Sequence, residues 1–291
     1  MTNERNHNDN IVDYVSQELT NEDKKYAAEY LNETDETREN AVSEIKLWIE
    51  NELRIQIDDF LILRFLRVGK FNLEKTKIRI RNYYKQRSNL PEWFTNKNPF
   101  QPKVQEYLNL GMFLPLLKPD NQGRLILLIR GTLNDPRIHN IADMSKACML
   151  TIELAVKFYP AASVYGIVSL IDMIDPTIRH ILQFGPHTIM NIIHTWQSCY
   201  PMRYQAFNVF NVPKFFNVII NLAKSFMTKK LKDRFHVYAD NLECFKDIPA
   251  NILPVEYGGT AGTCQELTEY WKKAIEENSD WLTKDDNVQI E

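Results

Sequence analysis

The sequence predicts a mixed α/β domain that follows a small helical domain. Two continuous apolar runs, residues 124–130 and 166–174, are typical of strands covered on both faces. Residues 204–211 are rich in aromatic and β-favouring side chains and end at Val212-Pro213, which predicts a third strand. Helical periodicity fills the intervals between these runs, and this alternation indicates a sheet layered with helices.

Composition limits the cellular setting. No apolar run reaches the ~18–20 residues that a membrane-spanning helix needs, and the polar start lacks a signal-peptide core. We therefore expect a cytoplasmic protein. Four scattered cysteines, which form no CxxC pair, predict free thiols rather than zinc or disulfides: Cys148, Cys199, Cys244 and Cys264.

Charge is unevenly distributed along the chain. Residues 1–52 carry 14 acidic and 5 basic side chains, and residues 239–291 carry 12 and 4, in a chain of net charge −3. The centre is therefore strongly basic, which favours an anionic surface as a partner. Residues 64–87 mix basic and aromatic side chains as nucleic-acid-binding helices do, but the pI of 6.1 and the acidic ends argue against nucleic acid.

Before Pro91 the periodicity is helical. The predicted helices span residues 36–52, 58–69 and 73–87, with weaker helical signals at 11–19 and 22–31. In the second part, helices are expected at 145–158 and, split near Gly185-Pro186, over 177–196. A further strand is expected at 235–240.

Residues 214–227 predict an unusual helix. Its polar side chains form one narrow stripe, and the rest of its circumference is apolar. Such a helix is either fully buried, or it meets the core on one side and a lipid or membrane on the other. Lys229, Lys230, Lys232 and Arg234 follow at once; a solvated helix end is the simpler explanation for this basic run.

Catalytic signatures are missing from the chain. It contains no GxGxxG, GxxxxGK[ST] or GxSxG motif, so we expect no enzyme activity. His180, His187 and His194 recur every seven residues, but Gly185-Pro186 separates them, which predicts structural histidines and no metal site. Asp172 and Asp175 suit a strand end and its turn better than acid–base chemistry.

Six segments together resemble the CRAL-TRIO family, in the branch of tocopherol-transfer and retinaldehyde-binding proteins. They are residues 60–87, GRLILLIRG (123–131), YPMR (200–203), NVP (211–213), KKLKDRFHVY (229–238) and LPVEYGG (253–259). The resemblance covers about residues 40–260. It implies a lipid-binding α/β domain with a mixed sheet floor, helices and an amphipathic gate helix, preceded by a small all-α domain.

The implied organisation has four parts. Residues 1–35 form a flexible or loosely docked segment, 36–98 the helical domain, 99–262 the lipid-binding domain and 263–291 a helical tail. The resemblance implies a monomer that shields one hydrophobic ligand, such as a tocopherol, retinoid or carotenoid, with no other cofactor. It would exchange this ligand while transiently bound to membranes that contain phosphoinositides.

Site residues are assigned by the same resemblance. The expected lipid pocket comprises Ile152, Ile171, Leu182, Phe184, Ile192, Trp196, Phe207, Phe216 and Ile219. The expected gate helix presents Phe215, Val218, Leu222 and Phe226, and the expected phosphoinositide-binding residues are Arg203, Lys230 and Arg234. Two basic positions of the relatives are Gly69 and Gln205 here, which puts headgroup binding in question. Phospholipid transfer and a non-transferring, lipid-sensing adaptor are the alternative functions.

Overall fold

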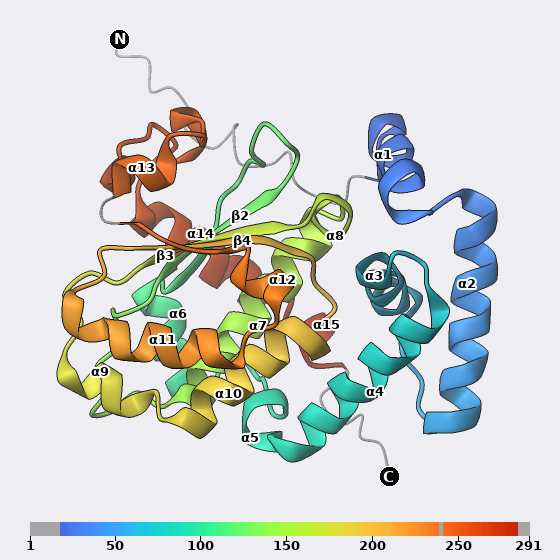
Figure 1. The fold of residues 1–291 in the computed structure, drawn as a ribbon, viewed down its shortest axis with the longest axis horizontal. Helices are drawn as coiled ribbons and strands as arrows, with labels where there is room; N and C mark the ends of the chain where they lie inside the picture. Colours follow the sequence, from blue (N-terminus) through green and yellow to red (C-terminus); the bar gives the residue numbers. More distant parts are fainter. Residues whose placement is uncertain (1–17, 239–240, 285–291) are drawn as a thin grey trace.

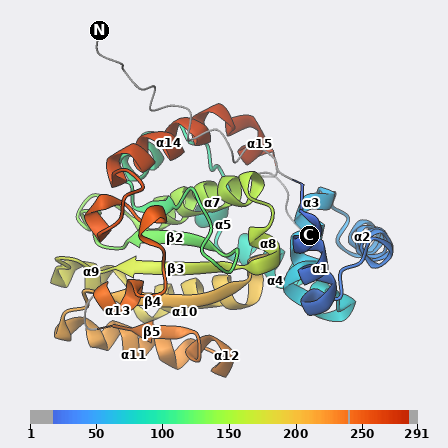
Figure 2. The same cartoon turned by 90° about the horizontal axis from the view of Figure 1, so that it is seen from above.

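The computed structural model describes residues 18–238 and 241–284 (Figure 1). Most of the helical signal at 11–19, the last residues of the strand predicted at 235–240 and the end of the predicted tail lie outside this range. Within it, the chain folds into a group of N-terminal helices beside a larger α/β part (Figures 1 and 2). The predicted fold class is confirmed.

The N-terminal helices begin where polar side chains can cap them. They are α1 (Asn21–Leu31), α2 (Asp35–Trp48) with a π-helical turn (Ile49–Leu53), α3 (Asp59–Gly69), α4 (Leu73–Asn89) and α5 (Pro91–Phe94). Thr20, Thr34, Asp58 and Asn72 each accept a hydrogen bond from a backbone N–H three residues on. The helices predicted at 22–31, 36–52, 58–69 and 73–87 are confirmed.

One five-stranded sheet forms the floor of the α/β part. Its strands lie in chain order: β1 (Phe113–Pro115), β2 (Leu125–Arg130), β3 (Ile167–Asp172), β4 (Tyr204–Phe210) and β5 (Phe235–Val237). β1 runs antiparallel to β2, and the other neighbours are parallel. Strand β1 is not predictable from the sequence, because three residues that end in proline are too few to show a strand period.

Helices cover both faces of the sheet. The remaining helices are α6 (Pro102–Leu110), α7 (Ile141–Phe158), α8 (Ala162–Tyr165), α9 (Ile178–Gln183), α10 (Pro186–His194) continuing as a π-helical turn (Thr195–Cys199), α11 (Asn217–Phe226) after a 3-10 turn (Lys214–Phe216), α12 (Lys229–Lys232), α13 (Asn241–Phe245), α14 (Cys264–Glu277) and α15 (Ser279–Thr283). Helices α7, α10 and α11 lie on one side of the sheet, and α13 lies on the other (Figure 1). Two 3-10 turns, Ala250–Ile252 and Val255–Tyr257, complete the structure.

β3 separates two different environments. Side chains alternate between the faces of a strand, so Ser169 and Ile171 face α7 while Leu170 and Asp172 face the opposite way. Asp172 accepts hydrogen bonds from Asn211 Nδ2 and Tyr257 Oη, both at 2.8 Å, and so fastens the 253–259 segment to the sheet. This is a structural role, as predicted.

The turn after β3 holds Asp175 at φ 51°, the left-handed conformation that glycine adopts most easily. Aspartate tolerates this conformation better than most residues other than glycine.

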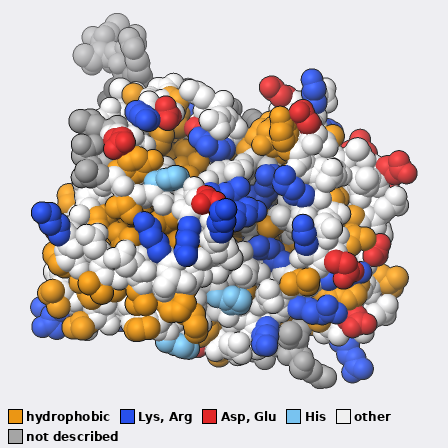
Figure 3. Space-filling view, viewed as in Figure 1, with side chains coloured by type: hydrophobic (Ala, Val, Ile, Leu, Met, Phe, Trp, Pro, Cys, Tyr) orange, Lys and Arg blue, Asp and Glu red, His pale blue; other side chains and the backbone are white. Residues whose placement is uncertain are grey.

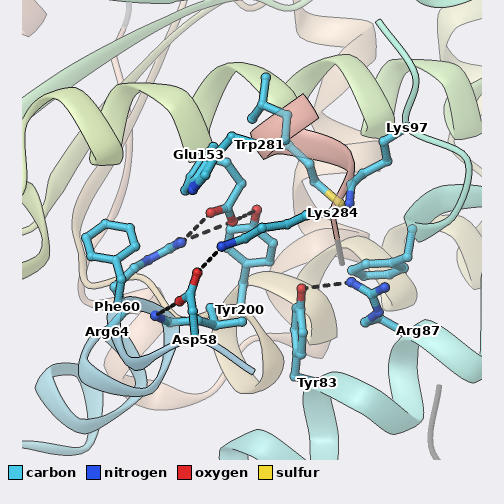
Figure 4. A pocket seen from close by; sticks show the side chains of 14 residues that line it. Asp58, Phe60, Arg64, Tyr83, Arg87, Lys97, Glu153, Tyr200, Trp281 and Lys284 are labelled. Atoms are coloured by element: carbon cyan, nitrogen blue, oxygen red, sulfur yellow. Dashed lines mark hydrogen bonds and ion pairs between the residues drawn. The ribbon is translucent and has the colours of Figure 1, made fainter. Parts of the chain in front are cut away.

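A buried polar network joins the N-terminal helices to α7. Arg64 on α3 forms an ion pair with Glu153 on α7, and Tyr200 Oη donates a second hydrogen bond to the same carboxylate (Figure 4). Arg67 pairs with Glu33 at 2.8 Å and donates to Ser163 Oγ at 2.6 Å. These contacts fix the two parts of the molecule relative to each other.

Candidate ligand cavity and basic surface

An apolar cavity of about 260 Å³ lies between the sheet and the helices on the α7 side. Its floor comes from β2, β3 and β4, its walls from α7 and α10, and its cover from α11 and the segment after it. The floor and cover residues include Leu127, Ile129, Ser169, Ile171, Tyr204, Phe207, Ala223, Met227, Leu231 and Phe235. The cavity is slightly smaller than the roughly 300–1,000 Å³ of most small-molecule pockets.

The lining is apolar and deformable. Among the described residues, no charged side chain lines the cavity, and five of the protein's eight methionines do: Met112, Met144, Met149, Met173 and Met227. Methionine side chains are unbranched and adapt to irregular shapes. The cavity can therefore adjust to an apolar molecule somewhat larger than its present volume.

Six of the nine predicted pocket residues line this cavity: Ile152, Ile171, Phe184, Ile192, Trp196 and Phe207. Leu182, Phe216 and Ile219 do not. Leu182 is 75% exposed on α9. Phe216 and Ile219 pack instead with Met173 and Val209 in a separate apolar cluster.

The position of the cavity along α11 explains why Phe216 and Ile219 do not line it. The cavity lies under the C-terminal half of α11, where Ala223 and Met227 reach it, whereas Phe216 and Ile219 lie one to three turns earlier. The apolar pattern of this helix marks nearly its whole circumference, so it could not show which turn meets the cavity. No sequence signal distinguished Met227, Leu231 or Phe235 from ordinary core residues.

The predicted gate residues lie on the outer side of α11. Phe215 is 44% and Val218 68% exposed, while Leu222 and Phe226 are half-buried. Four further apolar side chains are exposed on or beside α9 and α10: Ile174, Ile178, Leu182 and Met190. We call Phe215, Val218 and these four residues the outer apolar face; hydrophobic side chains gather over α9, α10 and α11 in Figure 3.

The three predicted phosphoinositide-binding residues come together beside α12. Burial lowers the pKa of Lys230, and neighbouring cations lower it further, in the order Arg234, Arg79, Arg203 and Lys70. Burial and Arg234 likewise lower the pKa of Arg203. We call these five residues the basic cluster; blue side chains gather at the centre of Figure 3.

The arginines of the basic cluster are held by backbone carbonyls. Arg203 donates to Val164 O, Arg234 to Tyr204 O, and Arg79 to Gln197 O and Tyr200 O. Within residues 18–238 and 241–284, none of the five forms a salt bridge with a carboxylate. Concentrated positive charge of this kind favours a bound anion.

Arg79 is a member of the basic cluster that the sequence does not predict. It lies on α4, more than a hundred residues from Lys230, and only the docking of α4 against the π-helical turn brings it there. The two departures from the family pattern are also explained. A Cβ at Gly69 would lie 2.5 Å from Thr76 Oγ1, so α3 and α4 approach too closely for a side chain. Gln205 donates to Tyr165 O at 2.7 Å and is engaged in the fold.

The three evenly spaced histidines occupy different environments. His180 is buried; its Nδ1 accepts a hydrogen bond from Thr177 N at 2.9 Å, and its Nε2 lies 3.0 Å from Asn134 O. His187 Nδ1 lies 3.3 Å from Asn191 Nδ2, and burial lowers the pKa of His194. Among the described residues, no three His, Cys, Asp or Glu side chains are placed to hold a metal.

Comparison with known proteins agrees with this architecture. The model of the CRAL/TRIO domain matches residues 110–259, more than half of the chain. This chain belongs to the CRAL-TRIO family. A second model, described as the Pinta-like UBA domain, matches residues 34–104, which hold α2 to α5.

Among curated CRAL-TRIO relatives, alpha-tocopherol transfer protein-like of Mus musculus is 32% identical over 81% of this chain and 69% of its own. The Homo sapiens protein of the same name is 30% identical over 89% of this chain and 75% of its own length. Clavesin-2 of Homo sapiens is 25% identical over 79% of this chain and 71% of its own length. The crystal structure of Sfh5 shares the fold, with a TM-score of 0.53 at 14% identity, over 90% of this chain and 99% of that one.

The membership places this chain in a family of lipid-binding and lipid-transfer proteins. No helix in the described part of the chain is long and apolar enough to cross a membrane.

Proposed function

We propose that this protein carries one hydrophobic molecule, of the tocopherol, retinoid or carotenoid type, and exchanges it at membranes that contain phosphoinositides. The observation that carries the proposal is the cavity, because it is apolar, lies under α11 and has no charged side chain among its described lining residues. Burial of apolar surface contributes ~25 cal/mol per Å². A ligand that buries several hundred Å² gains on the order of 10 kcal/mol before ordering costs.

Helix α11 is suited to connect the cavity with a membrane. Ala223 on α11 and Met227 just after it cover the ligand space, while Phe215 in the preceding 3-10 turn and Val218 on α11 are exposed. If α11 moves away, its inner side chains lose their cover, and a bilayer interface supplies an alternative one. The outer apolar face would enter the interface first, so that the membrane lowers the free energy needed to open the cavity.

The basic cluster would hold the protein at the phosphorylated headgroup. Lys230 is exposed and lies near four other cations. Basic side chains gather beside the hydrophobic side chains of this face of the molecule (Figure 3). Each basic residue near an anionic bilayer surface contributes about 1 kcal/mol. The apolar and electrostatic contributions therefore act on one side of the molecule.

The cavity chemistry favours this cargo over a phospholipid. A charged headgroup inside the domain needs charged or multiple polar partners, and the described lining offers a few hydroxyl groups and no charged side chain. Mass spectrometry of lipid extracted from natively purified protein tests this directly. One isoprenoid or polyene species per chain supports the carrier, phospholipid moves the protein to phospholipid transfer, and an empty cavity favours an adaptor.

Transfer between vesicles tests the role of the basic cluster. Lys230→Ala should slow ligand transfer to phosphoinositide vesicles about fivefold, because one cation near the surface is lost. Lys230 makes no hydrogen bond within the described residues, so folding and ligand binding should be unaffected. Arg234→Ala is a poorer choice, since Arg234 also holds Tyr204 O.

Lys273→Ala is the matched control. Lys273 has the same charge, is 77% exposed at its side chain, and lies on α14, away from α11 and α12 (Figure 2). Equal transfer rates for both variants would rule out the proposed headgroup site.

A further inference from the structure

Two hydroxyl groups on the cavity floor lack hydrogen-bond partners. Ser169 on β3 is 1% exposed, and its Oγ is fully buried with no partner in the structure. Tyr204 on β4 is 8% exposed, and its hydroxyl makes no hydrogen bond to any of the described residues. Both residues line the cavity.

The two groups belong to one region of the floor. Ser169 pairs in register with Phe207 on the neighbouring strand. The ring of Phe207 lies 4.8 Å from the ring of Tyr204, centroid to centroid. Burial raises the pKa of Tyr204 well above its usual value, and nearby Cys148 adds to this, so the hydroxyl stays a neutral donor.

Other hydroxyls of the lining are already engaged. Ser145 Oγ donates to Ile141 O at 2.8 Å within α7. Thr195 Oγ1 accepts a hydrogen bond from Gln86 Nε2 at 3.2 Å. Ser169 thus differs from them, because a fully buried hydroxyl without a partner is destabilising unless something else supplies the hydrogen bond. The Tyr204 hydroxyl is also free to bond, because Tyr204 lines the cavity and its hydroxyl forms no hydrogen bond with the described residues.

We propose that Ser169 and Tyr204 form a subsite for one neutral oxygen of the cargo, an alcohol, phenol or carbonyl group, held against the cavity floor. A charged group would be buried there without a counter-ion, and a pure hydrocarbon would leave both hydroxyls unpaired. This proposal rests on the proposed carrier function. It adds that the cargo carries a polar oxygen and binds in one orientation, with the oxygen against the sheet and the apolar remainder extending toward α11.

The probes are retinol and its deoxy hydrocarbon analogue axerophthene, which differ only in the hydroxyl group. Binding to ligand-free full-length protein is followed through tryptophan fluorescence, because Trp93 and Trp196 line the cavity. Ser169→Ala and Tyr204→Phe should each weaken retinol binding about three- to tenfold and leave axerophthene binding unchanged. Thr151→Val is the matched control and should change neither affinity, because Thr151 lies on α7 outside the cavity lining and its hydroxyl donates to Ala147 O at 2.8 Å.

Thermal unfolding of the ligand-free protein adds a second readout. Ser169→Ala should unfold at the same or a higher temperature than wild type, since it removes a buried hydroxyl without a partner. The subsite is ruled out if both variants bind retinol as wild type does, or if they weaken both probes equally. If wild-type protein binds neither of these probes nor α-tocopherol, the carrier proposal fails and the subsite fails with it.

Discussion

Two hollows lie on either side of helix α7, and Met149 lines both of them. The ligand cavity is about 260 Å³, and within the described residues its lining carries no charge. The other hollow, at the junction with the N-terminal helices, is about 50 Å³ and contains Arg64 and Glu153 (Figure 4). Two successive residues of α7 face them, Ile152 toward the cavity and Glu153 toward the hollow.

The difference shows how one helix can support both a rigid junction and an adaptable site. In the small hollow, burial alone would raise the pKa of Glu153, but Arg64 and the Tyr200 hydroxyl hold it below its usual value. A buried ion pair of this kind tolerates little rearrangement, because each partner depends on the other. The methionine-rich cavity has no such requirement, so its side chains can move around a ligand.

The largest difference in the free energy of unfolding is expected between alanine variants of two adjacent residues of β3. Leu170 is 0% exposed on the face away from the cavity, whereas Ile171 lines the cavity. Leu170→Ala should lower the free energy of unfolding by about 3–4 kcal/mol, because it creates a new void. Ile171→Ala should cost less than about 2 kcal/mol, because it enlarges a space that already exists.

Urea denaturation of both variants measures these costs, and ligand titration should show the reverse order. Ile171→Ala should weaken binding of the extracted cargo, whereas Leu170→Ala should not. Equal losses of stability would mean that Ile171 is ordinary core and that the cavity closes in solution.

Glu153→Gln tests the rigidity of the small hollow. It should lower the free energy of unfolding by about 3 kcal/mol, the lower end for breaking a buried pair, because 21% of the Glu153 side chain is exposed. Glu277→Gln, which removes an exposed pair with Lys273 at 3.9 Å, should cost less than about 0.5 kcal/mol. Chemical denaturation distinguishes them; a negligible loss for Glu153→Gln would contradict the view of this junction as a rigid one.

A smaller effect is expected on the outer apolar face. Leu182→Asp should weaken vesicle binding about tenfold, because burial of a leucine side chain contributes ~1.5–3 kcal/mol. Leu47→Asp is its control: Leu47 is 60% exposed on α2, away from α11, and Leu182 is 75% exposed. Sedimentation with vesicles measures both. Unchanged binding of Leu182→Asp would exclude α9 from the membrane contact.

The sequence allowed the helices, most of the strands and the strand–proline–helix unit at 204–227 to be predicted. These features depend on local periodicity and on capping residues such as Asn72, and both are determined by residues that are close together in the sequence. Of the predicted pocket residues, Ile171 and Phe207 lie on a strand face and line the cavity. Leu182 lies away from it, because α9 is a six-residue helix with too few turns to show which side faces inward.

The basic cluster illustrates the same limit. Lys230 and Arg234 are close in sequence and were predicted together, but Arg79 joins them only through the packing of α4. The sequence likewise could not predict that the hydroxyls of Ser169 and Tyr204 lack hydrogen-bond partners, because this depends on the atoms that surround them in the fold. Serine and tyrosine occur in strands for many reasons.

The sequence by itself determined which elements form, which of their faces are apolar and where positive charge accumulates, since these properties are written in residue order. Only the tertiary structure decided which apolar face meets an empty space, which meets solvent and which distant cations gather around Lys230. The physical reason is that burial and hydrogen-bond satisfaction depend on atoms that the chain brings together from far apart, and no local pattern records their final distances.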